Sequence, residues 1–326
     1  MRLRHLALIA SALVVSSVTA ACNSSTGLSV TGAGLLDGRL FGTRGRPFGL
    51  GISPAGQALV LQLDNMTAAR FAITADTITD TIRVGYNPID VDFTATGNLA
   101  FMTMLDGARV YRIDLTSGAV SSVAVGARHH RISLLPNGGA YDLFNIDGKV
   151  RRVDATTGIA GDSVALGGAS APVLRGVARR SQDGRIAVAG GSWVWLLNGA
   201  TLDVLDSLDL LTETQEVVFS KDGSELFVAL EFASRVMVLD AASMTVTDSI
   251  LFPNDPMSPF AMRLSPDGRT LLVSSAASGR VAVVDPASRA VRRVLVVGGI
   301  PRRIAYGPNG QRAFVTNEGG WVDVIK

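Results

Sequence analysis

The sequence predicts an all-β fold, a seven-bladed β-propeller of four-stranded antiparallel blades, and three observations support this. A tight turn ending in glycine recurs seven times, at spacings of 41, 41, 46, 39, 45 and 42 residues. Short apolar and partly β-branched runs flank each turn, as expected of strands. No window of useful length places apolar residues at helical spacing. A period near 40 residues built from short strands is typical of propeller blades.

Seven turn glycines mark the repeat along the chain. They are Gly56, Gly97, Gly138, Gly184, Gly223, Gly268 and Gly310. The sixth copy shows a whole blade, with an inner strand expected over residues 260–264 and a second strand over 271–275. The third and outer strands of that blade are expected over 280–285 and 291–297. Both faces of a blade pack on neighbouring blades, which explains why these strands are apolar nearly throughout.

The two ends of the propeller sequence are expected to meet in one blade. The last copy stops after a third strand over residues 321–326 and has no fourth. The run over residues 38–42 precedes Pro47 as an outer strand precedes the next blade. We therefore expect this run to supply the missing outer strand. Such closure removes the exposed edges that an open array of strands would present.

The last two copies resemble a known repeat. The tetrapeptide FVTN at residues 314–317 is similar to the Tyr-Val-Thr-Asn signature of the YVTN family of β-propeller repeats. The sequence SPDG at 265–268, followed by VAVVD at 281–285, resembles the rest of that repeat. The resemblance covers about residues 31–326 and weakens in the third and fourth copies, which lack the tetrapeptide. It implies a propeller and, because one fold hosts many functions, no particular activity.

The N-terminus predicts export. Residues 1–21 combine a basic start at Arg2 and Arg4, an apolar run of ten residues, and small residues just before Cys22. This is the composition of a secretory signal peptide, and it is too short to span a bilayer as a stable helix. The sequence TAAC at 19–22 resembles the bacterial lipobox, although that family usually has leucine at the first of these positions. Cys22 is the single cysteine of the chain, so an intramolecular disulfide is excluded.

These features predict three segments. They are a signal peptide over 1–21, a lipidated Cys22 with a flexible tether over 22–30, and the propeller over 31–326. The resemblance to lipoproteins implies a diacylated Cys22, and two acyl chains are what stable membrane attachment needs. Asn23 resembles an outer-membrane sorting signal, so we expect an exported lipoprotein of the outer membrane that faces the periplasm or the cell surface. The alternative is ordinary cleavage shortly before an incidental cysteine.

Removal of the signal peptide leaves a neutral protein. Residues 1–21 carry two of the 30 Lys and Arg residues and no acidic residue, so 28 basic side chains remain against 28 Asp and Glu. A neutral protein with only three lysines lacks the basic surface that nucleic acids select. We therefore expect no nucleic-acid partner. Some YVTN-like propellers bind nucleic acid, so this function is kept as a second alternative.

Most polar residues that recur in the repeat have a structural explanation. Carboxylate or amide side chains follow the third strand in five blades, at Asp114, Asp154, Asn198, Asp240 and Asp285. The residues after them are typical of Asx turns, in which the side chain binds nearby backbone N–H groups. Outside the signal the histidines are His129 and His130, which are adjacent in a strand and therefore point to opposite sides. We expect no metal site, no cofactor and no catalytic residue.

One group of polar residues fits a ligand site. Propeller geometry places the starts of the inner strands and the ends of the second strands on one rim around the central channel. Charged or imidazole side chains gather at these inner-strand starts, namely Asp90, His130, Arg131, Arg175, Glu216 and Arg303. We expect a partly solvated, mixed-charge rim, where a single change to alanine costs about 0.5 kcal/mol or less of stability. The competing interpretation is a set of structural ion pairs, such as Asp90 with Arg131.

These observations predict a non-enzymatic cell-envelope lipoprotein that uses a propeller as a binding scaffold. Its partners would be a small polar ligand, a glycan or an envelope protein, and its only membrane contact would be the lipid anchor. The alternative function is a propeller enzyme, a lactonase or other hydrolase or a dehydrogenase-like protein, with its site at the channel mouth. That enzyme would need His130 or Glu216 as general base, and the sequence shows no nucleophile paired with a base.

Overall fold

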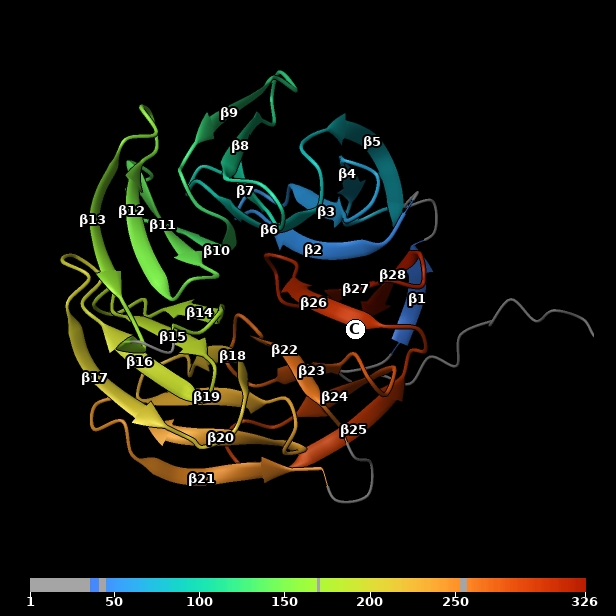
Figure 1. The fold of residues 1–326 in the computed structure, drawn as a ribbon. Coiled ribbons are helices and arrows are strands. Elements are labelled where there is room, and N and C mark those ends of the chain that lie inside the picture. Colours follow the sequence, from blue (N-terminus) through green and yellow to red (C-terminus); the bar gives the residue numbers. More distant parts are fainter. Residues whose placement is uncertain (1–35, 41–44, 169–170, 253–256) are drawn as a thin grey trace, which may run out of the picture. The chain divides into compact units, whose positions relative to one another are not determined.

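A computed structural model describes residues 36–40, 45–168, 171–252 and 257–326. The described residues form seven four-stranded antiparallel sheets arranged in a ring, as Figure 1 shows. No helix among them is long and apolar enough to cross a membrane. The predicted all-β, seven-bladed propeller is therefore confirmed. The predicted signal peptide, Cys22 and the tether lie outside the described residues.

Each blade contains an inner, a second, a third and an outer strand, and blade 7 takes its outer strand from the start of the chain. The inner strands of blades 1 to 7 are β2 (Pro47–Ile52), β6 (Pro88–Phe93), β10 (His129–Leu134), β14 (Leu174–Arg179), β18 (Thr214–Phe219), β22 (Pro259–Leu264) and β26 (Pro301–Tyr306). The second strands are β3 (Ala58–Gln62), β7 (Leu99–Met104), β11 (Ala140–Asn145), β15 (Ile186–Gly190), β19 (Glu225–Leu230), β23 (Leu271–Ser275) and β27 (Ala313–Asn317). The third strands are β4 (Thr67–Ala72), β8 (Arg109–Asp114), β12 (Lys149–Asp154), β16 (Trp193–Leu197), β20 (Arg235–Asp240), β24 (Arg280–Val284) and β28 (Trp321–Ile325). The outer strands are β5 (Thr77–Arg83), β9 (Val120–Ala124), β13 (Ala160–Ala165), β17 (Val204–Asp209), β21 (Val246–Leu251), β25 (Val291–Val296) and β1 (Leu36–Leu40).

The ring has two faces that differ in their connections. At one face, here called the crossover face, each outer strand leads into the inner strand of the next blade. At the other, here called the turn face, each inner strand ends in the tight turn that leads to the second strand. All seven turn glycines have positive φ angles between 70° and 80°, a region that glycine enters without steric cost. The turn chemistry expected from the sequence thus explains why the repeat is marked by glycine.

The first strand of the propeller closes the ring. β1 pairs with β28 in antiparallel register, with Arg39 opposite Asp323 and Leu40 opposite Val322. The prediction that a strand near residues 38–42 closes the ring is therefore confirmed. The strand begins two residues earlier than predicted, at Leu36. Buried Leu40 joins the apolar cluster between blades 7 and 1, and Arg39 Nε donates to Asp323 Oδ1 at 3.0 Å. These two contacts fix the register, and the guanidinium of Arg39 also lies 4.8 Å from the centre of the Trp321 ring.

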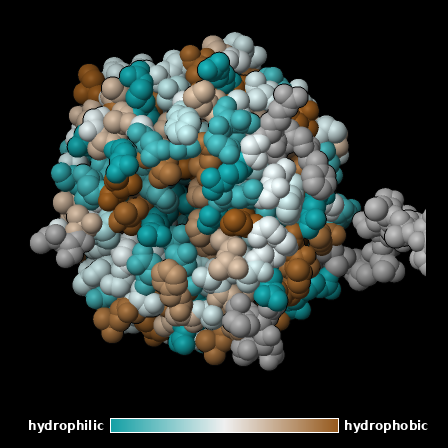
Figure 2. Space-filling model, turned by 45° about the vertical axis from the view of Figure 1, so that its right-hand side comes forward, coloured by the Kyte–Doolittle hydropathy of each residue, from teal (hydrophilic) through white to brown (hydrophobic). Residues whose placement is uncertain are grey.

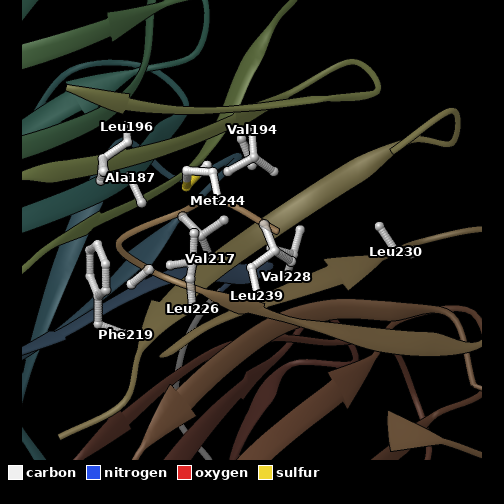
Figure 3. Close-up of a cluster of buried hydrophobic side chains, with 12 residues drawn as sticks. Ala187, Val194, Leu196, Val217, Phe219, Leu226, Val228, Leu230, Leu239 and Met244 are labelled. Atoms are coloured by element: carbon white, nitrogen blue, oxygen red, sulfur yellow. The ribbon is translucent and has the colours of Figure 1, made fainter. Parts of the chain in front are cut away.

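The core is divided among the blade interfaces. Seven clusters of buried apolar side chains occur among the described residues, and each joins two neighbouring blades. Figure 3 shows the cluster between blades 4 and 5, where Ala187, Val194 and Leu196 face Val217 and Val228. Each blade buries one face on either neighbour, which is why its second strand is buried almost throughout, whereas the outer strands are largely exposed. The ring therefore holds the inner strands rigidly around the central channel.

Deletion of residues 31–44 tests the closure. This change removes β1 and leaves the carboxylate of Asp323, which is fully buried, without Arg39. Removal of one partner of a buried ion pair costs about 3–5 kcal/mol, and the free edge of β28 adds to that loss. We expect a fall of at least about 3 kcal/mol in the free energy of unfolding, measured by urea denaturation. Deletion of 23–30 is the control and should leave stability unchanged; equal stability of the two truncations would contradict closure by β1.

Candidate binding site in the central channel

The predicted rim residues lie within the inner strands. The sequence pattern predicts them just before these strands, but the structure places them at the second and third strand positions. Every inner strand has a register irregularity among its first four residues. A β-bulge bends a strand and redirects its side chains. The third residues of four inner strands are Asp90, Arg131, Glu216 and Arg303, from blades 2, 3, 5 and 7.

These four third-position side chains meet across the channel axis. Arg131 Nη1 donates to Glu216 Oε2 at 3.0 Å, and Arg303 Nη1 donates to the same oxygen at 2.6 Å. Arg131 Nε lies 3.2 Å from Asp90 Oδ2, which also accepts a hydrogen bond from the backbone N–H of Ile132 at 2.9 Å. The repeat therefore brings together residues more than 200 positions apart in the chain. We call these four residues the axial network.

The axial network is buried, which corrects the expectation of a solvated rim. Asp90, Glu216 and Arg303 are 7%, 4% and 6% exposed. Second-position side chains cover the network on the crossover side. Phe48 and Phe260 meet edge to face with 6.2 Å between ring centres, and the Arg303 guanidinium lies 5.5 Å from the Phe260 ring. The network is therefore buried because aromatic rings from other blades cover its charges. The sequence pattern of a single blade does not reveal this cover.

The other two predicted rim residues lie outside the network. Arg175 donates to Gln215 Oε1 at 3.1 Å and pairs with Glu213 at 3.1 Å, next to Glu231 at 3.7 Å. His130 has a buried Nδ1 atom without a hydrogen-bond partner among the described residues. Burial, together with the positive charges of Arg303, Arg131 and Arg175, lowers the pKa of His130 to about 3. This imidazole is therefore neutral and only weakly basic at physiological pH.

A cavity of about 540 Å³ extends from the axial network toward the turn face. Its lining includes all four network residues and no second-position residue of any inner strand. It also includes the exposed residues Ser181, Lys221 and Arg263 near the inner-strand ends. Figure 2 shows a hollow with hydrophilic walls near the middle of one face of the ring. The network thus forms the floor of the cavity, and the cavity opens at the face opposite the predicted rim.

Several charged residues in this cavity were missed by the sequence analysis. Asp92 and Arg263 occupy the fifth positions of β6 and β22, two residues beyond the third position. Side chains alternate along a strand, so the period of two that starts at Asp90 would have found them. Asp92 accepts hydrogen bonds from the backbone N–H groups of Phe93 and Leu134, both at 2.8 Å. Burial nevertheless raises the pKa of Asp92 to about 6.

Two further cations complete the lining. Arg179 donates to Asp142 Oδ2 at 2.7 Å, and Asp142 is fully buried and also binds Arg152. Lys221 lies in the exposed turn after β18. The aliphatic part of Lys221 lies over Gly268, where an added Cβ would come within 2.7 Å of it. Arg179 is thus held in place by structural partners, whereas Lys221 extends from an exposed turn.

The other polar residues singled out from the sequence have structural roles. Asp114 and Asp154 each accept two backbone N–H bonds from the residues after them, which confirms the predicted Asx turns. These bonds lower the pKa of both carboxyls. His129 is fully buried and its Nδ1 lies 2.5 Å from Asn145 Oδ1. Across the part of the chain that the structure describes, no three His, Cys, Asp or Glu side chains are grouped to hold a metal ion.

Comparison with known proteins supports the fold alone. No family model and no curated protein sequence matches this chain. Among solved structures, the β-propeller domain of Myceliophteria thermophila Cps50 (Swd1) is similar, with a TM-score of 0.77. The alignment covers 90% of this chain and 99% of that chain at 12% sequence identity. Such a likeness shows that the chain has a β-propeller fold.

The change Glu216→Ala tests whether the axial network stabilises the ring. It leaves Arg131 and Arg303 close together and buried without their shared carboxylate. Removal of one partner from a buried ion pair costs about 3–5 kcal/mol, so we expect a loss of that size in urea denaturation. Glu213→Ala is the matched control, because Glu213 pairs with Arg175 at a 30% exposed position. Exposed pairs contribute about 0–1 kcal/mol. Equal losses in the two variants would show that the network is not a stabilising floor.

Proposed function

We propose that this chain is an exported, lipid-anchored binding protein that holds a small polar ligand in the cavity at its turn face. The proposal keeps the predicted scaffold role and moves the site from the crossover rim to the opposite mouth of the channel. The observation that carries it is the cavity of about 540 Å³, closed at its base by the axial network. Small-molecule sites generally measure about 300–1,000 Å³.

The construction of the cavity favours binding. Its walls are the seven inner strands, which are held by apolar interfaces on both faces of every blade. A site built on such strands is preorganised, so a ligand loses less affinity to ordering of the protein. The floor is a set of paired charges, and the mouth carries unpaired polar side chains. A ligand that enters the cavity therefore contacts polar side chains held in fixed positions, and the network closes the cavity below it.

The two residues named as possible general bases fit binding better than proton transfer. Glu216 Oε2 accepts from two guanidinium groups, so this oxygen is already occupied by two ion pairs. His130 has a pKa of about 3, far below the value near 7 that suits a general base at neutral pH. His130 also lies outside the lining of the cavity. The geometry therefore supports a scaffold more than the enzyme alternative.

The same proposal includes the family of the protein and its location in the cell. The FVTN tetrapeptide at residues 314–317 supports membership of the YVTN-repeat propellers. The signal-like segment 1–21 and the lipobox-like TAAC at 19–22 support export and acylation of Cys22. Asn23 supports the outer membrane. An anchored propeller with a ligand cavity would serve as a receptor or carrier in the cell envelope.

The change Ser181→Trp tests the cavity as the ligand site. Ser181 is exposed and lines the cavity, so an indole at this position would occupy its mouth. We expect native mass spectrometry of the purified full-length protein to show a small molecule that is released on denaturation. Ser181→Trp should reduce its occupancy by about tenfold, the effect of a clash of ~1.4 kcal/mol. Ser163→Trp on the exposed outer strand β13 is the control. Equal occupancy in the two variants would contradict the proposed site.

The change Cys22→Ser tests the anchor. Without the thiol no acyl chain can be attached, and stable membrane association needs two lipid signals. We expect the variant to move from the membrane fraction to the soluble envelope fraction after cell fractionation. Asn23→Asp is the companion variant, which should keep membrane attachment and change only the membrane in which the protein is found. Membrane association that survives Cys22→Ser would show that the protein is not held by a lipid on this residue.

A further inference from the structure

We infer that the ligand of the central cavity is a small anion, whose carboxylate, phosphate or sulfate group binds between Lys221 and Arg263 at the mouth. This inference rests on the proposed function and names the chemical class of its ligand. Two observations carry it: the charge balance of the lining, and the lack of a direct ion pair at the two mouth cations.

The lining carries more positive than negative side chains. Its cations are Arg131, Arg179, Lys221, Arg263 and Arg303, and its carboxylates are Asp90, Asp92 and Glu216. A surplus of one sign of charge within low-dielectric walls attracts ligands of the opposite sign. The surplus of positive charge therefore selects an anion, although the propeller as a whole is expected to be neutral.

The two mouth cations differ from the other three. Arg131 and Arg303 pair with Glu216, and Arg179 pairs with Asp142. Lys221 and Arg263 are exposed, and no ion pair joins either of them to a carboxylate among the described residues. Lys221 and Arg263 act on Asp267 and Asp92 only through longer-range charge interactions. They are free to bind an anionic group that enters from solvent.

The floor is balanced in charge, so the surplus lies above it. Arg131 and Arg303 share one oxygen of Glu216, and Arg131 Nε lies 3.2 Å from Asp90 Oδ2, so two guanidinium groups face two carboxylates. Burial and the neighbouring charge of Arg131 lower the pKa of Arg303 to about 10. The positive surplus of the lining therefore lies at its wall and mouth, where Lys221 and Arg263 stand.

The charge of Asp92 provides a second, independent test of where the anion binds. It faces Asp90 on its own strand, Arg131 on β10 and Arg263 across the channel, and β2 contributes no charged side chain to the lining. Its pKa is raised to about 6, so it is ionised at pH 7.5 and largely protonated at pH 5.5. Protonation removes one negative charge from the cavity. Affinity for an anion should therefore rise as the pH falls through 6.

The first experiment measures binding of defined anions to the full-length protein in detergent by isothermal titration calorimetry. The probes are sulfate, inorganic phosphate and succinate, with glucose as the neutral comparison. We expect the anions to bind and the double variant Lys221→Ala, Arg263→Ala to weaken them by at least about tenfold, the effect of losing charged hydrogen bonds. A preference for phosphate or sulfate over succinate would identify a tetrahedral group as the native chemistry, and the reverse a carboxylate.

Arg293→Ala is the matched control. Arg293 is an exposed arginine on the outer strand β25 of the same blade as Arg263, outside the cavity lining. It removes the same charge and should leave binding unchanged. Equal weakening by Arg293→Ala would show diffuse electrostatic attraction and overturn the inference. Binding of glucose without binding of any anion would overturn the anionic class while the proposed binding function stands.

The second experiment follows sulfate, whose charge is constant across the range, from pH 7.5 to 5.5. We expect at least about a threefold gain in affinity at the lower pH, because one nearby negative charge disappears. Asp92→Asn should bind sulfate tightly at both pH values and show no such gain. A sulfate affinity that is independent of pH in the unaltered protein would place the anion away from Asp92 and overturn the proposed position.

Discussion

The free edges of the seven inner strands impose the constraint on which the rest of the channel depends. Each inner strand lies at one end of its sheet, so its axis-facing backbone groups have no strand partner. Buried backbone groups must be paired, and side chains from neighbouring blades supply the partners. Asp90 and Asp92 accept the N–H groups of β10, and Thr316 Oγ1 donates to the carbonyl oxygen of Phe48 at 2.6 Å. The channel of a propeller is therefore polar for structural reasons before any ligand is considered.

This constraint separates two kinds of charge along the axis. At the floor, Glu216 and Arg303 are buried and Arg131 is largely buried, and their pairing offsets the cost of taking ions out of water. Such a network also favours one arrangement of blades, because a shifted inner strand would leave a buried charge unpaired. At the turn face, Lys221 and Arg263 are exposed, and no ion pair joins their charges to a carboxylate among the described residues. The first group belongs to the architecture, and the second is available for recognition. The distinction between the two groups rests on burial and pairing.

The fold was predictable because its signals are local. A turn glycine with positive φ and an Asx turn such as that of Asp114 depend on a few consecutive residues, and both recur at the period of the blade. Closure followed from counting strands, but its exact start did not, because β1 has a register irregularity between Leu36 and Gly38. The site was predictable only in part. The sequence pattern gathered Asp90, Arg131, Glu216 and Arg303 at one level of the channel. Their burial depends on aromatic rings from other blades, such as Phe48 and Phe260, and no single repeat encodes that cover.

Two residues of the tetrapeptide that resembles the YVTN signature have structural roles. Asn317 accepts the backbone N–H of Ile300 at 2.8 Å and donates to the carbonyl oxygen of Gly298 at 2.9 Å, so it fixes the crossover between blades 6 and 7. Thr316 joins blade 7 to blade 1. Both residues stabilise the ring, so a repeat that retains them retains the fold. The third and fifth positions of the inner strands behave in the opposite way. They range from glycine and alanine to aspartate and arginine from blade to blade. The repeat alone does not require such variety, so the residues at these positions are particular to this chain.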